Sequence, residues 1–362
     1  MNGSSTKERF LILVINPGST STKLSLFAND EETVSKTIPH STDELKPYKK
    51  ISEQTDFRLK LIENFLSENR VNLKSIDAFI GRGGLLKPIE SGVYAVNDAM
   101  LDDLGSAKYG EHASNLGGIL AYTLASRSDS PAFIADPVVV DEMEEVARLS
   151  GIPEIERKSI FHALNQKSSA REVARSLGKK YEECNFIVAH LGGGISIGAH
   201  RKGRVVDVNN ALDGEGPYSP ERSGGVPVGQ LLEMAMKDGF TYEEMKRKIT
   251  GDGGITSYCG TNDLQELHAR IERGDGKAGL VFEAMAYQIS KEIAMHGATL
   301  KGDVDRIILT GGMAHDEKLT ELIKERTGFI AKVEIVPGER EMVSLALSAL
   351  AALKKELPVK SY

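Results

Sequence analysis

Cysteine is scarce in this sequence: its 362 residues contain two, Cys184 and Cys259. Neither stands at metal-ligand spacing from another cysteine, so we expect no disulfide framework and a reducing compartment. Long apolar runs are also missing, because no stretch approaches the roughly 20 apolar residues of a membrane span. The first ten residues are polar and lack the apolar core of a signal peptide. We therefore expect a cytoplasmic protein with no membrane partner.

An excess of positive charge is missing as well. Lys and Arg number 45 against 52 Asp and Glu, which gives a formal net charge of −7. This balance argues against nucleic acid as a main partner. The 40% of apolar and 27% of charged residues are ordinary for a globular protein. At 362 residues the chain exceeds the size at which single cores stop growing, which favours two domains.

Three common nucleotide-binding motifs are absent. A P-loop requires G-x-x-x-x-G-K-[ST], and the Gly-Lys pair at 276–277 is followed by Ala278. A dinucleotide fingerprint fails after Gly192, because Ile197 stands where the last glycine should be. The signatures of protein kinases are also missing. A nucleotide site in this chain therefore has to be of another kind.

A strand, Gly-rich turn, strand pattern recurs along the chain. Residues 10–27 read FLILVINPGSTSTKLSLF, and residues 186–200 read FIVAHLGGGISIGAH, with Asn16 and His190 at the same place before the turn. Residues 306–313, RIILTGGM, repeat the first half. Glycine lets backbone N–H groups approach phosphate oxygens closely. The pattern predicts two similar halves that clamp one nucleotide.

The candidate phosphate-binding residues lie in these turns. Hydroxyl and amide groups donate hydrogen bonds to phosphate oxygens, and lysine supplies charge. The predicted set is Asn16, Ser19, Ser21 and Lys23 in the first turn, Gly192, Gly193 and Gly194 in the second, and Gly311 and Gly312 in the third.

Strand and helix patterns alternate, which predicts an α/β protein with mixed sheets, because the opening hairpins exclude a purely parallel sheet. Strands are expected at 11–15, 23–27, 76–80 and 132–135, and helices at 98–104, 116–125, 162–177, 228–238, 242–250, 280–300 and 343–353. The first domain is predicted at 1–180 with the C-terminal segment 343–362, and the second at 181–342.

Ten stretches together resemble the acetate and butyrate kinase family. They are INPGSTSTK, IGRGG, EHASNLGG, IADP, IFHALNQK, AHLGGGISIGAH, GPYSPERSGGVP, CGTNDL, ILTGG and PGEREM, in this order between residues 12 and 342. The family belongs to the superfamily of sugar kinases, actin and heat-shock chaperones. This resemblance implies two similar actin-like, ribonuclease H-like domains with a nucleotide cleft between them.

Several details look more like butyrate kinase than acetate kinase. HLGGG at 190–194 stands where acetate kinases carry His-Leu-Gly-Asn-Gly, and PERSGGVP at 220–227 replaces their Gly-Thr-Arg-Cys-Gly stretch. Asn16 occupies the place of an Asp in actin-like ATPases and sugar kinases generally. The resemblance implies that Mg²⁺-ATP phosphorylates butyrate or a similar short-chain carboxylate, reversibly, by direct in-line transfer. It also implies a homodimer or higher homo-oligomer.

The resemblance further implies roles for individual residues. Arg82 and Arg222 match arginines that neutralise charge, and an arginine fork can bridge carboxylate and phosphoryl oxygens. Asp136 matches an acidic catalytic residue and would serve Mg²⁺ directly or through water. Glu341 or Glu339 is the second metal candidate. The remaining implied residues are His162 and His190 near the transferred phosphoryl group, and Asn262 and Asp263 in the adenosine site of the second domain.

Two other functions remain open from the sequence. An acetate or propionate kinase would use the same residues and differ in its preferred acid. An actin-like ATP-binding module would change shape without phosphorylating a carboxylate, and it would carry Asp at the position of Asn16. Turnover on acids of different chain length separates all three hypotheses.

Overall fold

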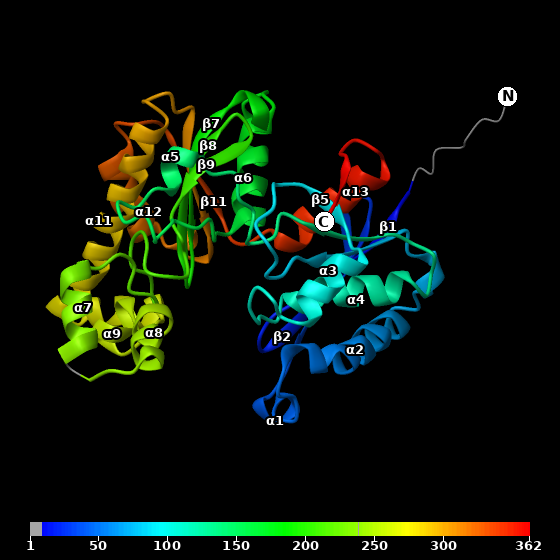
Figure 1. Ribbon diagram of the computed structural model, residues 1–362. Helices are drawn as coiled ribbons and strands as arrows, with labels where there is room; N and C mark the ends of the chain where they lie inside the picture. The colour runs from blue at the N-terminus through cyan, green and yellow to red at the C-terminus, as the bar shows by residue number, and fades with distance from the viewer. Residues whose placement is uncertain (1–8, 238) are drawn as a thin grey trace. The chain divides into compact units, whose positions relative to one another are not determined.

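The computed structural model describes residues 9–237 and 239–362 (Figure 1). The chain forms two compact units: unit 1 comprises Met1–Val140 and Arg340–Tyr362, and unit 2 comprises Asp141–Glu339. The polar N-terminal residues 1–8 and Asp238, the last residue of an expected helix, lie outside the described part. No helix in that part is both long and apolar enough to cross a membrane.

Unit 1 contains a seven-stranded mixed sheet in the order β12-β5-β6-β4-β1-β2-β3. The strands are β1 (Leu11–Pro17), β2 (Ser21–Ala28), β3 (Glu31–Pro39), β4 (Ala78–Arg82), β5 (Val93–Ala95), β6 (Ala132–Ala135) and β12 (Val359–Ser361). β1, β2 and β3 are antiparallel neighbours, whereas β1, β4 and β6 run parallel. The aliphatic runs in β1, β4 and β6 are almost wholly buried, as the inner strands of a covered sheet require.

Helices cover the parallel part of this sheet. α4 (Asn115–Ala125) contacts β1, β4 and β6 from one side, and α13 (Glu341–Leu353) contacts the same strands from the other (Figure 1). α2 (Thr55–Glu68) and α3 (Asp98–Gly105) pack on α4, and α1 (Thr42–Leu45) is a short turn before α2. α13 brings the end of the chain back to unit 1.

Unit 2 contains a five-stranded mixed sheet in the order β11-β10-β7-β8-β9. The strands are β7 (Asn185–Leu191), β8 (Ile195–Arg201), β9 (Arg204–Val208), β10 (Arg306–Gly311) and β11 (Val333–Pro337). β7, β8 and β9 are antiparallel neighbours, and β7, β10 and β11 run parallel. This order repeats the β3-β2-β1-β4-β6 part of unit 1.

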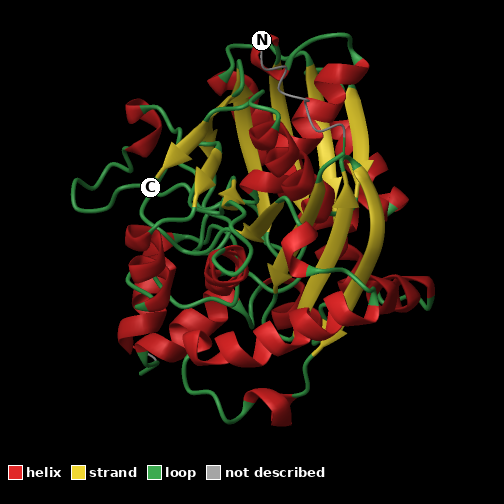
Figure 2. Cartoon of the chain, turned by 90° about the vertical axis from the view of Figure 1, so that its right-hand side faces the viewer, coloured by secondary structure: helices red, strands yellow, loops and turns green. Residues whose placement is uncertain are grey.

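Helices lie on both faces of the second sheet (Figures 1 and 2). α11 (Gly276–Thr299) and α12 (Glu317–Thr327) bury one large apolar cluster, and α6 (Ala163–Ser176) buries a smaller one on the other face. The remaining helices are α5 (Glu145–Arg148), α7 (Val228–Lys237), α8 (Tyr242–Thr250), α9 (Gly254–Cys259) and α10 (Leu264–Glu272). The predicted α/β fold with mixed sheets flanked by helices is thus confirmed.

The structure refines two features of the predicted organisation. The third Gly-rich segment, β10 with its turn, corresponds in sheet position to β4 rather than to β1, because it lies beside β7 as β4 lies beside β1. The compact units divide after Val140 and after Glu339, whereas the predicted boundaries lie near Lys180 and after Met342. Residues 141–180 group with unit 2 because α6 packs on β7 and β10.

Candidate active site

Three predicted residues of unit 1 stand at the same edge of its sheet. β1 and β4 are parallel with Ile15 opposite Gly81, so Asn16 and Arg82 follow at the same level. β4 and β6 are parallel with Arg82 opposite Ala135, and Asp136 comes one position later. The carboxyl ends of parallel strands meet at one edge, which is where open α/β sheets bind ligands.

Glu341 joins two of these residues from the start of α13. Asn16 Nδ2 donates a hydrogen bond to Glu341 Oε2 at 2.7 Å, and Arg82 Nη2 lies 3.0 Å from Glu341 Oε1. The Glu341 side chain is only 10% exposed, and that of Arg82 is 25% exposed. A carboxylate so placed at a helix N-terminus is also favoured by the helix dipole. The sequence had left the choice between Glu341 and Glu339 open.

Close backbone packing fixes the position of Arg82. A Cβ added to Gly81 would lie 2.0 Å from the carbonyl oxygen of Gly117 on α4, and one added to Gly117 would lie 2.1 Å from that of Arg82. Both positions therefore require glycine. Asn115 begins α4 and accepts a hydrogen bond from the N–H of Leu85 on Oδ1 at 2.8 Å. These contacts explain the IGRGG and EHASNLGG stretches as two sides of one helix–strand junction.

Asp136 is buried and holds a neighbouring turn. Its Oδ1 accepts hydrogen bonds from Ser91 Oγ at 2.6 Å and from the N–H of Gly92 at 2.9 Å. Its φ of 39° lies in the left-handed region, which only a few non-glycine residues adopt. Asp136 thus stands at the same sheet edge as Arg82, with one carboxylate oxygen engaged by unit 1 itself.

The two predicted histidines of unit 2 are brought together. The rings of His162, just before α6, and His190, on β7, are stacked with centroids 3.7 Å apart and planes 8° from parallel. His190 Nδ1 lies 2.8 Å from Asn165 Oδ1, an oxygen that also accepts from Thr310 Oγ1. An amide oxygen only accepts, so His190 Nδ1 carries a proton. His190 Nε2 then faces the Gly192 turn, and Glu339 Oε1 lies 3.6 Å from it.

A chain of buried polar groups sets the tautomer of His162. Gln166 Nε2 donates to the carbonyl oxygen and to the Oγ of Ser196, at 2.9 and 2.8 Å. The backbone N–H of His162 also donates to that Oγ, so the hydroxyl proton of Ser196 is left to donate to His162 Nδ1 at 2.9 Å. His162 Nε2 is consequently protonated and is a hydrogen-bond donor.

The same chain of hydrogen bonds continues from Gln166 to two further buried side chains. His200 Nε2 donates to Gln166 Oε1 at 2.9 Å, and Tyr181 OH donates to His200 Nδ1 at 2.7 Å. Burial, with smaller contributions from nearby Lys167, His296 and Arg171, holds the pKa of His200 well below its usual value. His200 is therefore neutral, as this direction of hydrogen bonds requires. Sequence reasoning missed Gln166, Ser196 and His200, although all three lie within quoted motifs.

The glycines of the second and third turns differ in whether a side chain could be accommodated at their positions. A Cβ on Gly194 would lie 1.9 Å from Arg222 Nη1, and Gly311 has a φ of 90° with Leu191 O only 2.4 Å from an added Cβ. The fold therefore requires glycine at 311, whereas a Cβ on Gly194 would meet and displace the end of the Arg222 side chain. A Cβ on Gly193 would make only an ordinary contact at 3.5 Å, and one on Gly312 would meet nothing within 4 Å. Gly193 and Gly312 thus leave space that the fold of unit 2 does not use.

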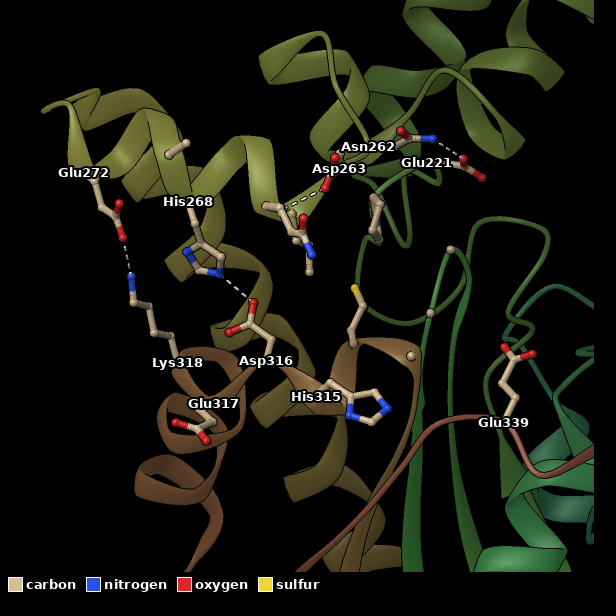
Figure 3. Close-up of a pocket in the computed structure, with 18 residues that line it drawn as sticks. Glu221, Asn262, Asp263, His268, Glu272, His315, Asp316, Glu317, Lys318 and Glu339 are labelled. Atoms are coloured by element: carbon tan, nitrogen blue, oxygen red, sulfur yellow. Dashed lines mark hydrogen bonds and ion pairs between the residues drawn. The ribbon is translucent and has the colours of Figure 1, made fainter.

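That space belongs to a cavity of about 900 Å³ in unit 2 (Figure 3). Its walls come from the turn after β7, the loop before α7, α10 with the residues just before it, and the start of α12 with the turn that precedes it. The predicted residues that line it are Gly192, Gly193, Asn262, Asp263, Gly312 and Glu339. Glu221, His268, His315, Asp316 and Lys318 line it as well, and sequence reasoning missed them.

Side chains around this cavity are held by contacts with one another. Asn262 Nδ2 donates to Glu221 Oε1 at 2.5 Å, and His268 Nε2 lies 2.6 Å from Asp316 Oδ2 (Figure 3). Asp263 caps α10, accepting from the N–H of Gln265 at 2.8 Å. The cap orients α10, whose residues form one wall of the cavity.

Arg222 is held beside the second turn. Its Nη1 donates to the carbonyl oxygen of Ala211, and its buried Nε has no hydrogen-bond partner among the residues that the structure describes. Burial lowers the pKa of the guanidinium, while the nearby Glu221 carboxylate acts in the opposite direction. Arg222 and the two histidines belong to unit 2, whereas Arg82, Asp136 and Glu341 belong to unit 1.

The model of the acetokinase family matches residues 151–334, which is more than half of the chain. The chain belongs to the acetokinase family. Members of the family are carboxylate kinases, so its general activity is that of a phosphotransferase that binds a nucleotide and acts on a carboxyl group. The match covers His162, His190, Arg222 and the cavity residues other than Glu339.

Solved structures of related proteins share the fold of this acetokinase. An acetate kinase of Porphyromonas gingivalis has a TM-score of 0.78 and 19% identity, covering 95% of this chain and 100% of that chain. A propionate kinase of Francisella tularensis has a TM-score of 0.72 and 18% identity, and the match covers 94% of this chain and 98% of that chain. An acetate kinase of Entamoeba histolytica has a TM-score of 0.73 and 17% identity, and the match covers 96% of this chain and 99% of that chain. At such identities the likeness establishes the fold.

Proposed function

We propose that this acetokinase transfers the terminal phosphoryl group of ATP to butyrate or a similar short-chain carboxylate, and catalyses the reverse reaction. The observation that carries the proposal is the cavity of about 900 Å³ in unit 2, where the turn glycines Gly193 and Gly312 meet Asn262 and Asp263. The four come from three separate stretches predicted to bind phosphate or adenosine. Butyrate is favoured by the HLGGG and PERSGGVP stretches, which depart from the acetate kinase pattern.

The chemistry requires charge neutralisation rather than a general base. A carboxylic acid with a pKa near that of Glu, about 4.3, is ionised at neutral pH and is already the nucleophile. The difficulty is the approach of this anion to a polyanion, so catalysis rests on positioning and on cations. Arg82 and Arg222 supply guanidinium groups, and neither is buried beyond reach of a ligand. We assign both arginines to the carboxylate and the transferred phosphoryl group.

His162 supplies a neutral donor. Its Nε2–H, fixed by the hydroxyl of Ser196, can donate a hydrogen bond to a phosphoryl oxygen as charge develops there. His190 stacks against His162 and limits the rotation of its ring. In this proposal His162 contacts the phosphoryl group, and His190 both supports it and borders the Gly192 turn.

Mg²⁺ is the proposed companion of ATP. No group of three or more His, Cys, Asp or Glu side chains able to hold a metal occurs in the described part of the chain. Mg²⁺ in phosphoryl-transfer sites takes one or two carboxylates, with water and substrate phosphates completing the shell. Glu341, a carboxylate oriented by Asn16 and Arg82, fits this hard-oxygen chemistry. Bound there, or near Asp136 through water, the ion would neutralise phosphate charge.

Acyl phosphate formation tests the proposal directly. Purified protein, Mg²⁺-ATP, butyrate and hydroxylamine should yield butyryl hydroxamate at a rate that depends on both ATP and the acid. A matched reaction without acid measures background ATP hydrolysis. ADP release that is equal with and without every acid tested would contradict the proposal and favour the ATP-binding module.

A homo-oligomer is the proposed assembly, with α7 as the contact. Val228, Leu232 and Met236 lie four residues apart on this helix and are 74%, 61% and 76% exposed. Such a stripe on one helix face is an apolar surface that a second copy can cover. We expect Leu232→Glu to lower the mass measured by light scattering to that of a monomer. Phe329→Glu, which adds the same charge at another exposed apolar position, should not; an unchanged mass in both variants would contradict this contact.

A further inference from the structure

Arg58 is a wholly buried arginine behind the first Gly/Ser turn of unit 1. It lies on α2, is 0% exposed, and is the largest of the fully buried side chains. A buried charge normally has a partner of opposite sign, because its desolvation is costly. Within residues 9–237 and 239–362, no carboxylate forms an ion pair with it. Burial lowers the pKa of Arg58 to about 10, so it is still a cation at neutral pH.

All five N–H groups of this guanidinium are used on neutral oxygens. Nη2 donates to the carbonyl oxygen of Gly18 at 2.9 Å, and Nη1 donates to the carbonyl oxygen of Ser21 at 3.0 Å. Nη1 also donates to Thr22 Oγ1 at 2.9 Å. Nε and Nη2 both donate to Gln54 Oε1, at 3.2 and 2.9 Å. Three of the four acceptor residues thus belong to the turn or to the first two positions of β2.

These hydrogen bonds decide which way the turn presents its backbone. The peptide between Gly18 and Ser19 is trans, since the described part contains no cis peptide bond, so its N–H points opposite to its C=O. With the Gly18 carbonyl held toward Arg58, the Ser19 N–H faces away from the interior. Ser19 itself is exposed. The turn therefore offers an outward donor, with a buried positive charge behind it.

The glycine of the turn leaves this side open. Gly18 does not adopt a positive φ, and a Cβ added to it would make only ordinary contacts, 3.5 Å from the O and Oγ of Ser21. Neither backbone conformation nor packing requires glycine here. Because the fold does not require glycine at this position, its lack of a side chain is consistent with close approach of a ligand to the turn.

We propose that Arg58 is a positioning residue for a phosphoryl anion at the Gly18–Ser19 turn. It orients the Ser19 N–H outward, and its charge, balanced by no carboxylate of the described chain, attracts the anion without touching it. The inference rests on the proposed function for the source of that anion, which is the phosphoryl group of ATP or of the acyl phosphate. Inorganic phosphate carries the same chemistry and serves as the probe.

Gln54→Glu is the sharpest test, because it separates the charge of Arg58 from its hydrogen bonds. A carboxylate at position 54 can accept both bonds that Gln54 Oε1 accepts, and it pairs the buried cation. The melting temperature of Gln54→Glu should be equal to or higher than that of the native protein. Phosphate affinity should nevertheless fall on the order of tenfold, since the attraction from Arg58 is cancelled nearby. Asn72→Asp, which adds the same charge on the surface of unit 1, is the control and should leave the affinity unchanged.

Phosphate binding is measured on the full-length protein by titration, following the backbone amide of Ser19 by NMR. In the native protein this amide should shift downfield as phosphate binds, and Gln54→Glu should need about ten times more phosphate for the same shift. An unchanged affinity in Gln54→Glu, or no shift of the Ser19 amide in the native protein, would overturn the inference. Arg58→Met should unfold more readily, because it leaves buried carbonyl oxygens without donors.

Kinase turnover measured on the same preparations keeps the two proposals apart. If the native protein binds phosphate at this turn, and Gln54→Glu weakens it, the role of Arg58 stands even when no acyl phosphate is made. If acyl phosphate forms normally and Gln54→Glu leaves both phosphate affinity and KM unchanged, the role of Arg58 is refuted while the proposed function stands.

Discussion

Asn16 donates a hydrogen bond of 2.7 Å to Glu341 across 325 positions of the sequence. The other oxygen of the same carboxylate is paired with Arg82. One acidic side chain at the start of α13 therefore connects the ends of β1 and β4. This contact joins the first and last of the motifs that the sequence singled out.

Removing either candidate arginine should lower turnover far more than a surface change does. We expect Arg82→Ala and Arg222→Ala each to reduce kcat/KM by about two orders of magnitude or more, because each removes a cation from the charge-neutralising set. Arg127→Ala is the matched control, since Arg127 pairs with Glu63 at the surface and is 48% exposed. Near-normal rates in both test variants, with the control unchanged, would remove the proposed mechanism.

The metal assignment predicts a difference between two neighbouring glutamates. Glu341→Gln should raise the Mg²⁺ concentration needed for half-maximal activity about tenfold or more, because it replaces the oriented carboxylate by a neutral amide. Glu339 is 51% exposed and lies near His190, so Glu339→Gln should leave that concentration nearly unchanged. A shift seen only with Glu339→Gln would reverse the assignment.

The glycines of unit 2 should separate into binding and structural positions. Gly193→Ala and Gly312→Ala should fold with native melting temperatures but bind ADP at least tenfold more weakly, because a methyl group would enter the cavity. Gly311→Ala should lower the free energy of unfolding by more than 1 kcal/mol, since it places a side chain at positive φ against Leu191. Calorimetry of binding and of unfolding measures both effects. Full ADP affinity in the first two variants would contradict this division.

The tautomer of His162 should depend on Ser196. In the native protein, ¹⁵N NMR of the imidazole should report protonation at Nε2, because the Ser196 hydroxyl donates to Nδ1. Ser196→Ala removes that donor and should lower kcat about tenfold with a smaller effect on KM. Ser196→Thr restores a hydroxyl and should restore both the tautomer and much of the rate. An unchanged tautomer in Ser196→Ala would show that the hydroxyl does not set it.

A partly buried glutamate gives unit 2 a defined pH dependence. Burial, with Asp207 and Glu215 nearby, raises the pKa of Glu292 to about 6, although Arg157 acts against the shift. Its proton is bound more tightly in the folded state, so its contribution to stability is complete below pH 4.5 and is lost as the pH rises through about 6.

Glu292→Gln should therefore stabilise the protein at pH 7 by up to about 2 kcal/mol, and this advantage should vanish near pH 4. Glu283→Gln, an exposed position on the same helix, is the control and should change little at either pH. Denaturant unfolding at several pH values measures the difference. A gain at pH 4 as large as that at pH 7 would contradict the account.

The sequence predicted elements with a periodic apolar pattern, whether or not they are buried: α7 buries none of its residues and α8 buries only Met245. β6 and α8 have the expected bounds, and α3, α4 and α6 differ from them by about a residue. β3 was not predicted, because it is an edge strand whose residues EETVSKTIP are mostly exposed and carry no apolar alternation. β5 and β12 are too short, at three residues each, to give a periodic signal.

Candidate site residues that lie in Gly-rich motifs were predicted from the sequence. Residues whose part in the site depends on tertiary contacts were missed. Arg58 is the fourth residue of the amphipathic helix α2, on which arginine normally faces solvent, and nothing local indicates its complete burial. Gln166 and Ser196 lie 30 positions apart, so their hydrogen bonds are visible only once β8 and α6 are placed. The pairing of Asn16 with Glu341 depends in the same way on the return of α13 to unit 1.

The most direct test of the central claim is kcat/KM for acyl phosphate formation with straight and branched acids of two to six carbons. One methylene in an apolar pocket is worth about 1–3 kcal/mol, so the values should vary in graded steps. The account predicts a maximum at butyrate or isobutyrate. A maximum at acetate or propionate would retain the carboxylate kinase and refute the butyrate assignment, and no product with any acid would contradict the proposed activity.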